Sequence, residues 1–301
     1  MSIKIPEDFA RRVEGAFGKR GQVFLHALPT LIGEATTRWQ LKGVRPAQEL
    51  SYNFIAYARR GETEVVLKLG VPDRELTSEI HALRAFAGRG AVRLIDGDSG
   101  RGMLLLERIK PGTNLASISN DAEATQIAAY VMLALLRPAP VDGGLLQLGD
   151  WFHGFQRFRA RHGGSGPLDP ALFQQAEEAA QELLEEDHRP TLIHGDLHHF
   201  NILSSGGSWV AIDPKGVIGP AAYEVGPFLL NPIGELNRRP DAAEVIRNRV
   251  VIFGEILGIN VERIRRCGMV HAVLSAIWSM EEGGNWKAAM EVAGVLAGLK
   301  V

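Results

Sequence analysis

Apolar residues in the first third of the chain occur in short runs separated by polar turns, a pattern typical of β-strands. Strands are expected over 38–41, 54–58, 64–69, 92–95 and 103–107. Two helices accompany them, one over 7–17 and one over 72–86, where apolar residues recur at helical spacing as Leu76, Ile80, Leu83 and Phe86. This part of the chain therefore predicts a small lobe built on an antiparallel sheet.

The pattern changes near Pro111 and Gly112, where helical segments replace the short strands. Asn120 and Glu123 form a capping signature that opens a long helix. Further helices are expected over 151–161, 170–186, 242–257, 261–280 and 286–299. The chain thus predicts an α+β fold of two lobes, with a nucleotide-binding lobe over 1–110 and a larger, mainly helical lobe for catalysis and substrate binding over 111–301.

A polar segment in the second lobe, His-Gly-Asp-Leu-His-His-Phe-Asn at 194–201, follows a short apolar run. Asp196 and Asn201 have four residues between them, the separation found in the kinase catalytic loop H-R-D-x-x-x-x-N, and Asp213 follows Asn201 by twelve positions. Two predicted strands, joined by a turn over 204–208, lead to Asp213. The sequence therefore predicts phosphoryl transfer, with one carboxylate orienting a hydroxyl and an amide and a second carboxylate holding Mg²⁺.

Each of these residues also has an ordinary structural interpretation. Asp196 and Asn201 are residue types common in turns, and Asp213 precedes a proline, which favours a turn start. His194 is expected to brace the loop as a neutral imidazole rather than to act in catalysis. The combination at this spacing, between predicted strands, favours the catalytic interpretation.

Lys68 interrupts the apolar strand over 64–69 and parallels the lysine of the kinase motif V-A-I-K. It could instead be a solvated residue of an edge strand. The helix that follows offers Glu75 and Glu79 as partners, and Glu79 is preferred because it lies one turn deeper, beside apolar positions. Such an ion pair would aim the ammonium group at the α- and β-phosphates of a nucleotide.

Two further nucleotide contacts are expected from the backbone. Glu107 ends the strand over 103–107 and Ile109 follows it, at the position of a kinase hinge, where backbone groups would hydrogen-bond adenine. No glycine-rich phosphate-binding motif occurs upstream, so the covering loop is assigned to 44–53, with Ser51 as a donor to phosphate. An ordinary hairpin loop is the alternative there.

The chain resembles the aminoglycoside phosphotransferases, and most closely the streptomycin and hydroxyurea kinase branch. The resemblance covers about residues 20 to 300 and rests on Leu67-Lys68 and on segments 79–86, 104–109, 194–198 and 212–219. It implies a protein-kinase-like fold that uses ATP and Mg²⁺, with Asp196 as catalytic base, Asn201 and Asp213 as Mg²⁺ ligands, and Lys68 as a phosphate contact braced by Glu79. The branch usually shows Pro-Ala-Tyr-Asp, whereas residues 220–224 here read Pro-Ala-Ala-Tyr-Glu, which shifts a structural acid.

The acceptor is expected to be a small hydroxylated cation, in first place streptomycin, because aminoglycosides are polycations. Their pocket should be acidic, and Glu281 and Glu282 at the end of a helix carrying Trp278 are the best candidates, with Asp150 as another. The acidic run 185–187 is a second possibility, although charge runs are usually solvated helix faces. Hydroxyurea, or an amino sugar or amino alcohol, remains the alternative acceptor.

Composition narrows the class further. With 301 residues, 46% of them apolar, the chain can bury a full core, and a formal charge of −2 disfavours nucleic acid as a partner. A single cysteine, Cys267, excludes an internal disulfide and suits a cytoplasmic enzyme. No signal peptide or membrane-spanning segment is expected.

Two other classes are weighed against the kinase. His194, Asp196, His198 and His199 resemble a metal-ligand cluster of a metallohydrolase, but only His271 lies downstream as a further histidine. A nucleotide-binding pseudokinase is disfavoured because Lys68, Asp196, Asn201 and Asp213 are all present.

Overall fold

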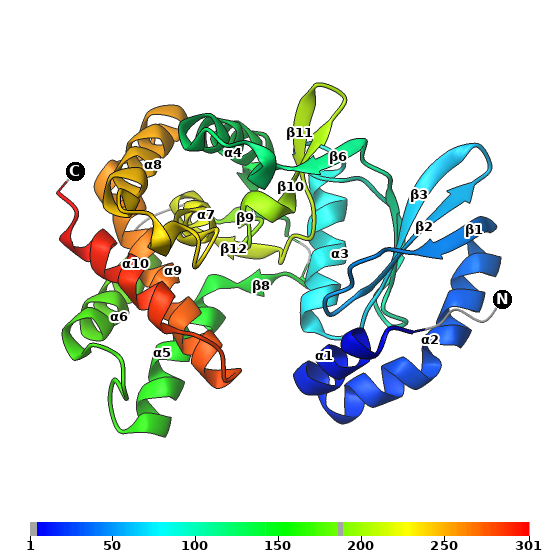
Figure 1. Cartoon of the computed structure of the whole chain (residues 1–301), viewed down its shortest axis with the longest axis horizontal. Helices are drawn as coiled ribbons and strands as arrows, with labels where there is room; N and C mark the ends of the chain where they lie inside the picture. The colour runs from blue at the N-terminus through cyan, green and yellow to red at the C-terminus, as the bar shows by residue number, and fades with distance from the viewer. Residues whose placement is uncertain (1–4, 142, 186–188, 301) are drawn as a thin grey trace.

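Two lobes lie side by side in the computed structural model, which describes residues 5–141, 143–185 and 189–300 (Figure 1). The smaller lobe contains a sheet of five strands, each antiparallel to its neighbours, in the order β1-β2-β3-β5-β4. The strands are β1 (Leu41–Pro46), β2 (Phe54–Arg60), β3 (Thr63–Leu69), β4 (Leu94–Asp98) and β5 (Met103–Glu107). The predicted α+β architecture is confirmed.

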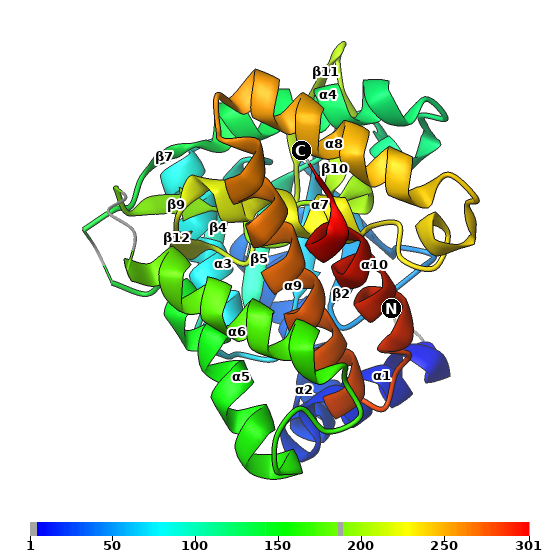
Figure 2. The ribbon, with the colours of Figure 1, turned by 90° about the vertical axis from the view of Figure 1, so that its left-hand side faces the viewer.

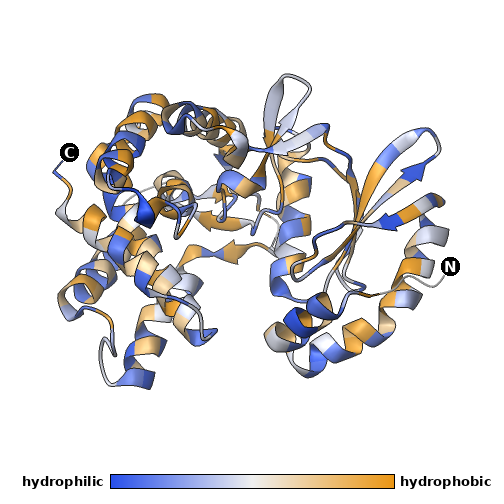
Figure 3. Cartoon of the chain, in the orientation of Figure 1, coloured by the Kyte–Doolittle hydropathy of each residue, from blue (hydrophilic) through white to orange (hydrophobic). Residues whose placement is uncertain are grey.

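Helices cover both faces of this sheet. Helices α1 (Glu7–Phe17) and α2 (Lys19–Arg38) pack on one face, whereas α3 (Arg74–Phe86) stands between the other face and the helical lobe (Figure 1). Side chains alternate between the two faces of a strand, so Val65 and Leu67 join the core under α2, while Lys68 points to the α3 side. The middle of the sheet is apolar, whereas the tip of the β2–β3 hairpin is hydrophilic (Figure 3).

The larger lobe is built around one long helix, α9 (Val261–Glu281), whose neighbours surround it (Figure 2). The other helices of this lobe are α4 (Asp121–Leu135), α5 (Leu148–His162), α6 (Pro170–Glu185), α7 (Gly226–Leu230), α8 (Ala242–Leu257) and α10 (Lys287–Gly298). The side chain of Asn120 accepts the backbone N–H of Glu123 at 3.2 Å, so the predicted cap of α4 is confirmed. No helix among the described residues is long and apolar enough to cross a membrane.

Two small sheets carry the predicted catalytic segments. One has the order β7-β9-β12-β8 and consists of β7 (Arg137–Pro138), β9 (Thr191–Ile193), β12 (Val217–Gly219) and β8 (Leu146–Gln147). The other has the order β11-β10-β6 and consists of β11 (Ser208–Ala211), β10 (Ile202–Ser205) and β6 (Pro111–Asn114). The loop 194–201 follows β9, and Asp213 follows β11, so both lie at strand ends as predicted.

Several expected elements differ from those in the structure. The strand expected over 38–41 is wrong, because α2 continues to Arg38 and β1 begins only at Leu41. The strand expected over 92–95 begins at Leu94, since the N–H of Val92 instead donates to the carbonyl of Ala211 at 2.8 Å. The turn expected over 204–208 is shorter, because β10 and β11 extend the hairpin from both sides.

Hydrophobic packing ties α3 to the larger lobe. Its inner residues Leu76, Ile80, Leu83 and Phe86 belong to the same core cluster as the C-terminal helices. The guanidinium of Arg137 also donates at 2.8 Å to the carbonyls of Ala85 and Phe86 at the end of α3. A helix of the first 110 residues is therefore anchored to the second lobe.

Candidate active site

The loop after β9 is held rigidly by two buried side chains. Nε2 of His194 lies 2.7 Å from the carbonyl of Ile212, while its Nδ1 accepts the backbone N–H of Asp196 at 3.2 Å. The proton therefore resides on Nε2, and burial lowers the pKa of His194 to about 4. His194 is a neutral brace of the loop, as the sequence indicated.

Glu224 is the second brace. Its carboxylate accepts the backbone N–H groups of His194, at 2.5 Å, and Gly195, at 3.1 Å. Burial raises the pKa of Glu224 to about 7, although the two hydrogen bonds act in the opposite direction. The insertion and the Asp-to-Glu exchange in segment 220–224 thus still place an acid beneath the catalytic loop.

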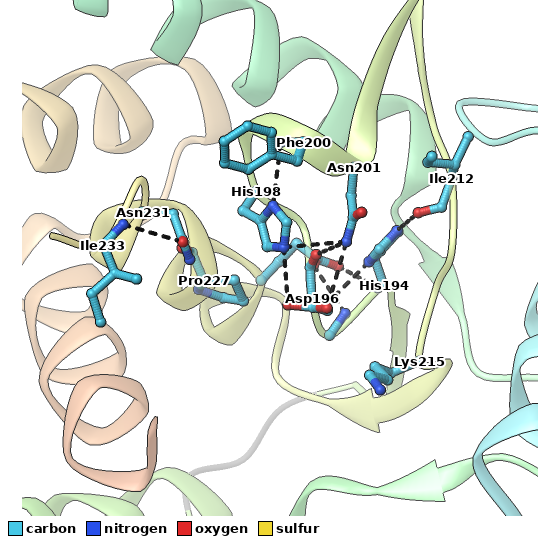
Figure 4. Close-up of polar contacts among 12 residues, drawn as sticks. His194, Asp196, His198, Phe200, Asn201, Ile212, Lys215, Pro227, Asn231 and Ile233 are labelled. Carbon is cyan, nitrogen blue, oxygen red and sulfur yellow. Dashed lines mark hydrogen bonds and ion pairs between the residues drawn. The ribbon is translucent and has the colours of Figure 1, made fainter. Parts of the chain in front are cut away.

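Asp196 and Asn201 face each other across this loop (Figure 4). Nδ2 of Asn201 donates to the backbone carbonyl of Asp196 at 2.9 Å, and Nε2 of His198 lies 3.6 Å from Oδ1 of Asp196. Burial raises the pKa of Asp196, yet its side chain keeps 38% of its surface exposed. A partly exposed carboxylate with a raised pKa is suited to receive a proton from a substrate hydroxyl.

Asp213 lies next to Asn201 because the N–H of Ile212 donates to the carbonyl of Asn201 at 2.9 Å. Asp213 has φ of 57°, a left-handed conformation that few residues other than Gly, Asn and Asp adopt. Nδ2 of Asn201 donates to Asp196, and the amide oxygen of Asn201 points away from Asp196 (Figure 4). One amide oxygen and one carboxylate fit Mg²⁺, which usually takes one or two protein ligands and completes its shell with phosphates and water.

Lys68 reaches the same place from the sheet. Its Nζ lies 2.7 Å from Oε1 of Glu79 and 3.2 Å from Oδ1 of Asp213, so the preferred partner Glu79 is the one that the structure pairs with it. Burial alone would lower the pKa of Lys68, but the carboxylates of Asp213 and Glu79 outweigh it and raise the pKa above its usual value. The ammonium group is therefore charged and fixed between the lobes.

The helix that carries Glu79 is docked directly onto the segment after Asp213. The hydroxyl of Ser78 donates to the carbonyl of Gly216 at 2.6 Å and accepts the N–H of Leu146 at 3.0 Å. Gly216 has φ of 70°, and a Cβ there would lie 2.7 Å from the carbonyl oxygen of Ser78 and from Cβ of Ala82. This close backbone contact therefore fixes the position of α3 relative to the segment that carries Asp213.

A cavity of about 190 Å³ lies between the sheet and the β10–β11 hairpin. Its lining includes Lys68, Glu107, Ile109 and Asp213, together with apolar residues of both lobes, among them Ile55, Val66, Leu203 and Ile212. Ser51 is not among the described residues that line it and is exposed in the connection between β1 and β2. The structure thus brings the residues predicted for the hinge and the charged residues to one cavity, and leaves Ser51 outside it.

None of the predicted acceptor residues is among the described residues that line this cavity. Asp150 forms an ion pair with Arg74 at 2.8 Å, whereas Glu281 and Glu282 are exposed at the end of α9. Trp278, one turn earlier in α9, packs edge-on against Trp151 at 5.5 Å, and a Cβ at Gly195 would lie 3.1 Å from the Trp151 ring. Of the run 185–187, only Glu185 falls within the described residues.

The histidine-rich loop does not form a metal centre of the metallohydrolase type. Among the described residues, no group of three or more His, Cys, Asp or Glu side chains could hold a metal ion. His199 is buried and stacks on Phe228 with ring centroids 4.0 Å apart, while both ring nitrogens of His194 are hydrogen-bonded to backbone groups. The site that the structure assembles is that of a phosphotransferase with the protein-kinase fold.

Comparison with known proteins agrees with this class. Residues 38–283 match the family described as "Aminoglycoside/hydroxyurea antibiotic resistance kinase". The chain belongs to this family. Its members are kinases, so the cavity between the lobes belongs to a nucleotide-using enzyme.

Individual relatives are similar over nearly the whole chain. A streptomycin 6-kinase from Streptomyces glaucescens is 33% identical over 97% of this chain and 95% of its own length. A hydroxyurea phosphotransferase from Kitasatospora aureofaciens is 31% identical over 93% of this chain and 82% of its own. Among solved structures, an aminoglycoside phosphotransferase in ternary complex with ADP and hygromycin B shares the fold, with a TM-score of 0.60, 16% identity, and coverage of 88% of this chain and 96% of its own.

Proposed function

We propose that this chain transfers the γ-phosphoryl group of ATP to a hydroxyl group of an aminoglycoside, with streptomycin as the first candidate. The observation that carries the proposal is the convergence of Lys68, Glu79 and Asp213, at 2.7 and 3.2 Å, beside the loop that presents Asp196. We divide the chain near residue 110 into a nucleotide-binding lobe and a catalytic, substrate-binding lobe. A cytoplasmic location, where ATP is available and the single buried thiol of Cys267 stays reduced, completes the proposal.

In the proposed reaction, Asp196 orients the acceptor hydroxyl and accepts its proton as the oxygen attacks the γ-phosphorus. Lys68 contacts the α- and β-phosphates and is held in position by Glu79. The backbone groups of Glu107 and Ile109 recognise adenine, whereas Ser51, which lies outside the cavity, is given no phosphate contact.

Mg²⁺ is the metal that Asn201 and Asp213 would hold. Carboxylates outnumber ammonium groups at the site, so a bare triphosphate would be repelled. When bound, the metal neutralises charge on the β- and γ-phosphate oxygens. Oxygen ligands on two adjacent chain segments match its preference.

The acceptor is inferred from charge and from the relatives. Glu281 and Glu282 offer exposed carboxylates near the Trp151–Trp278 pair, which favours a cation, and Asp150 adds a third carboxylate on the same helix as Trp151. Hydroxyurea is the alternative acceptor because one relative is named for it, and it is uncharged. An amino sugar or amino alcohol would fit the acidic residues equally well.

A panel of acceptors tests the proposal. Wild-type protein with ATP and Mg²⁺ is incubated with streptomycin, other aminoglycosides, hydroxyurea and amino alcohols, and the phosphorylated product is identified by mass spectrometry. Asp196→Ala serves as the blank and should still bind Mg-nucleotide, whereas Asp213→Ala should lose metal-dependent nucleotide binding. Equal transfer by wild type and Asp196→Ala would refute the assignment of roles.

A further inference from the structure

Two glutamates one turn apart on α3 each hold a lysine from a different lobe. Glu79 pairs with Lys68 of β3 at 2.7 Å, and Glu75 pairs with Lys215, two residues after Asp213, also at 2.7 Å. The exposed fractions of the two pairs differ greatly, at 3% and 9% for Lys68 and Glu79 but 39% and 59% for Lys215 and Glu75. The first pair is fixed in the interior, whereas the second is open to exchange because exposed ion pairs contribute little stability.

The backbone of Lys215 is anchored over the catalytic loop. Its N–H donates to the carbonyl of His194 at 2.8 Å, and the adjacent Gly216 is wedged against α3. A Cβ at Gly195 would lie 3.4 Å from Cβ of Lys215, so the side chain starts next to the residue that precedes Asp196. Figure 4 shows Lys215 on the segment below the loop that carries Asp196, with no contact drawn between the two side chains.

The charge of Lys215 acts on the carboxylates that surround the reaction centre. Its ammonium group interacts favourably with the carboxylates of Asp196 and Asp213, as well as with the carboxylate of Glu75. In the proposed function, the transferred phosphoryl group passes between the hydroxyl held by Asp196 and the nucleotide held at Asp213. Lys215 is therefore near the path of the group that moves.

We propose that Lys215 is a catalytic residue that leaves Glu75 and hydrogen-bonds the phosphoryl group during its transfer. The inference rests on the proposed function. The bond from the acceptor oxygen to the γ-phosphorus forms, the bond from that phosphorus to the leaving oxygen of ADP breaks, and the hydroxyl proton passes to Asp196. Lys215 keeps its protons and donates to the phosphoryl oxygens, where negative charge is spread in the transition state.

Lys68 does not fill this role. It is buried and held by two carboxylates, Glu79 and Asp213, so its reach is set by the sheet and by α3. Within the described residues, the ammonium group of Lys215 forms one ion pair, with the exposed Glu75, and its side chain is long and flexible. By leaving Glu75, the ammonium group can donate to the phosphoryl oxygens, and this contact accelerates transfer when it forms in the transition state and not in the ground state.

The alternative is that Lys215 only bridges the lobes through Glu75, and three variants separate the two roles. Lys215→Met should lower kcat by about 100-fold, the usual loss for one electrostatic donor, with little change in KM for ATP. Lys215→Arg should restore most of kcat because it keeps the charge. Glu75→Gln removes the bridge but not the cation, and should change kcat by no more than about fivefold, because an exposed ion pair contributes at most about 1 kcal/mol.

Equal losses of kcat in Lys215→Met and Glu75→Gln would overturn the proposal in favour of a bridge, as would an unchanged kcat in Lys215→Met. A binding measurement keeps the test independent of the acceptor. Calorimetry compares the affinity for Mg-ADP with that for Mg-ADP plus aluminium fluoride, which mimics the phosphoryl group in transfer. Lys215→Met should keep its affinity for Mg-ADP but lose the gain in affinity that aluminium fluoride gives. Retention of that gain would overturn the proposal for Lys215. Failure to phosphorylate any acceptor would instead refute only the proposed function.

Discussion

The carboxylate of Glu224 accepts the backbone N–H of His194, a residue 30 positions earlier in the chain. Together with its second hydrogen bond, to Gly195, this contact fixes the turn that presents Asp196. The catalytic loop is therefore shaped from beneath by an acid in a separate segment.

Glu224 should make stability depend on pH. Burial raises its folded-state pKa from 4.5 to about 7, so the folded state binds the proton more tightly than the unfolded state. The contribution of Glu224 to the free energy of unfolding is therefore fully present below pH 4.5 and is lost as pH rises through about 7. The loss amounts to up to about 3 kcal/mol. Urea unfolding across this range should show the decline in wild type but not in Glu224→Gln, and equal slopes in both proteins would contradict the assignment.

The buried Lys68–Glu79 pair should separate stability from nucleotide binding. Lys68→Met leaves Glu79 buried without its cation and should lower the free energy of unfolding by about 3–5 kcal/mol. The double variant Lys68→Met/Glu79→Met should regain much of that stability because both charges are gone, yet neither variant should bind Mg-ATP.

Chemical unfolding and calorimetric titration with Mg-ATP check these two expectations. Lys42→Met, an exposed lysine on β1 of the same sheet, is the matched control and should change neither quantity. Normal nucleotide binding by the double variant would remove Lys68 from the phosphate site.

Gly216 should tolerate no side chain. Its φ is 70°, and a Cβ at this position would lie 2.7 Å from atoms of Ser78 and Ala82, so Gly216→Ala should cost about 1–3 kcal/mol and displace the segment that carries Asp213. Gly206→Ala is the control, because Gly206 also has a positive φ, of 53°, but a Cβ there would meet nothing within 4 Å. The unfolding temperature and the nucleotide affinity should both fall in Gly216→Ala. In Gly206→Ala, only the cost of backbone strain is expected.

The proximity of several candidate site residues could be predicted because its signals are local. Asp196 and Asn201 lie on one loop, and Glu79 follows Lys68 by eleven positions on a helix whose apolar spacing marks its buried side. The contact between Lys215 and Glu75 spans 140 positions and has no local signature, although Lys215 stands in the segment that carried the family resemblance.

Other parts of the fold escaped prediction for different reasons. Helix α2 carries Phe24, Leu28, Leu31 and Ala35 at helical spacing, but Pro29 within it and a polar start weaken the pattern. Strand β6 has only four residues and pairs with β10, which lies about 90 positions later, so no short-range pattern marks it. Glu281 and Glu282, the residues proposed to bind the acceptor, are exposed, and exposure leaves many residue types acceptable at a position.

Glu281 and Glu282 provide the final test, since they distinguish a cationic from a neutral acceptor. Each exposed carboxylate contributes up to about 1 kcal/mol to a cation, so Glu281→Gln/Glu282→Gln should raise KM for streptomycin several-fold without changing KM for ATP. The effect should shrink as salt is added, because the Debye length falls to about 3 Å at 1 M ionic strength. Glu14→Gln, an exposed glutamate on α1, serves as the control and should leave KM unchanged. If hydroxyurea is the acceptor, its KM should be insensitive to both salt and the double variant, because an uncharged molecule gains nothing from these carboxylates.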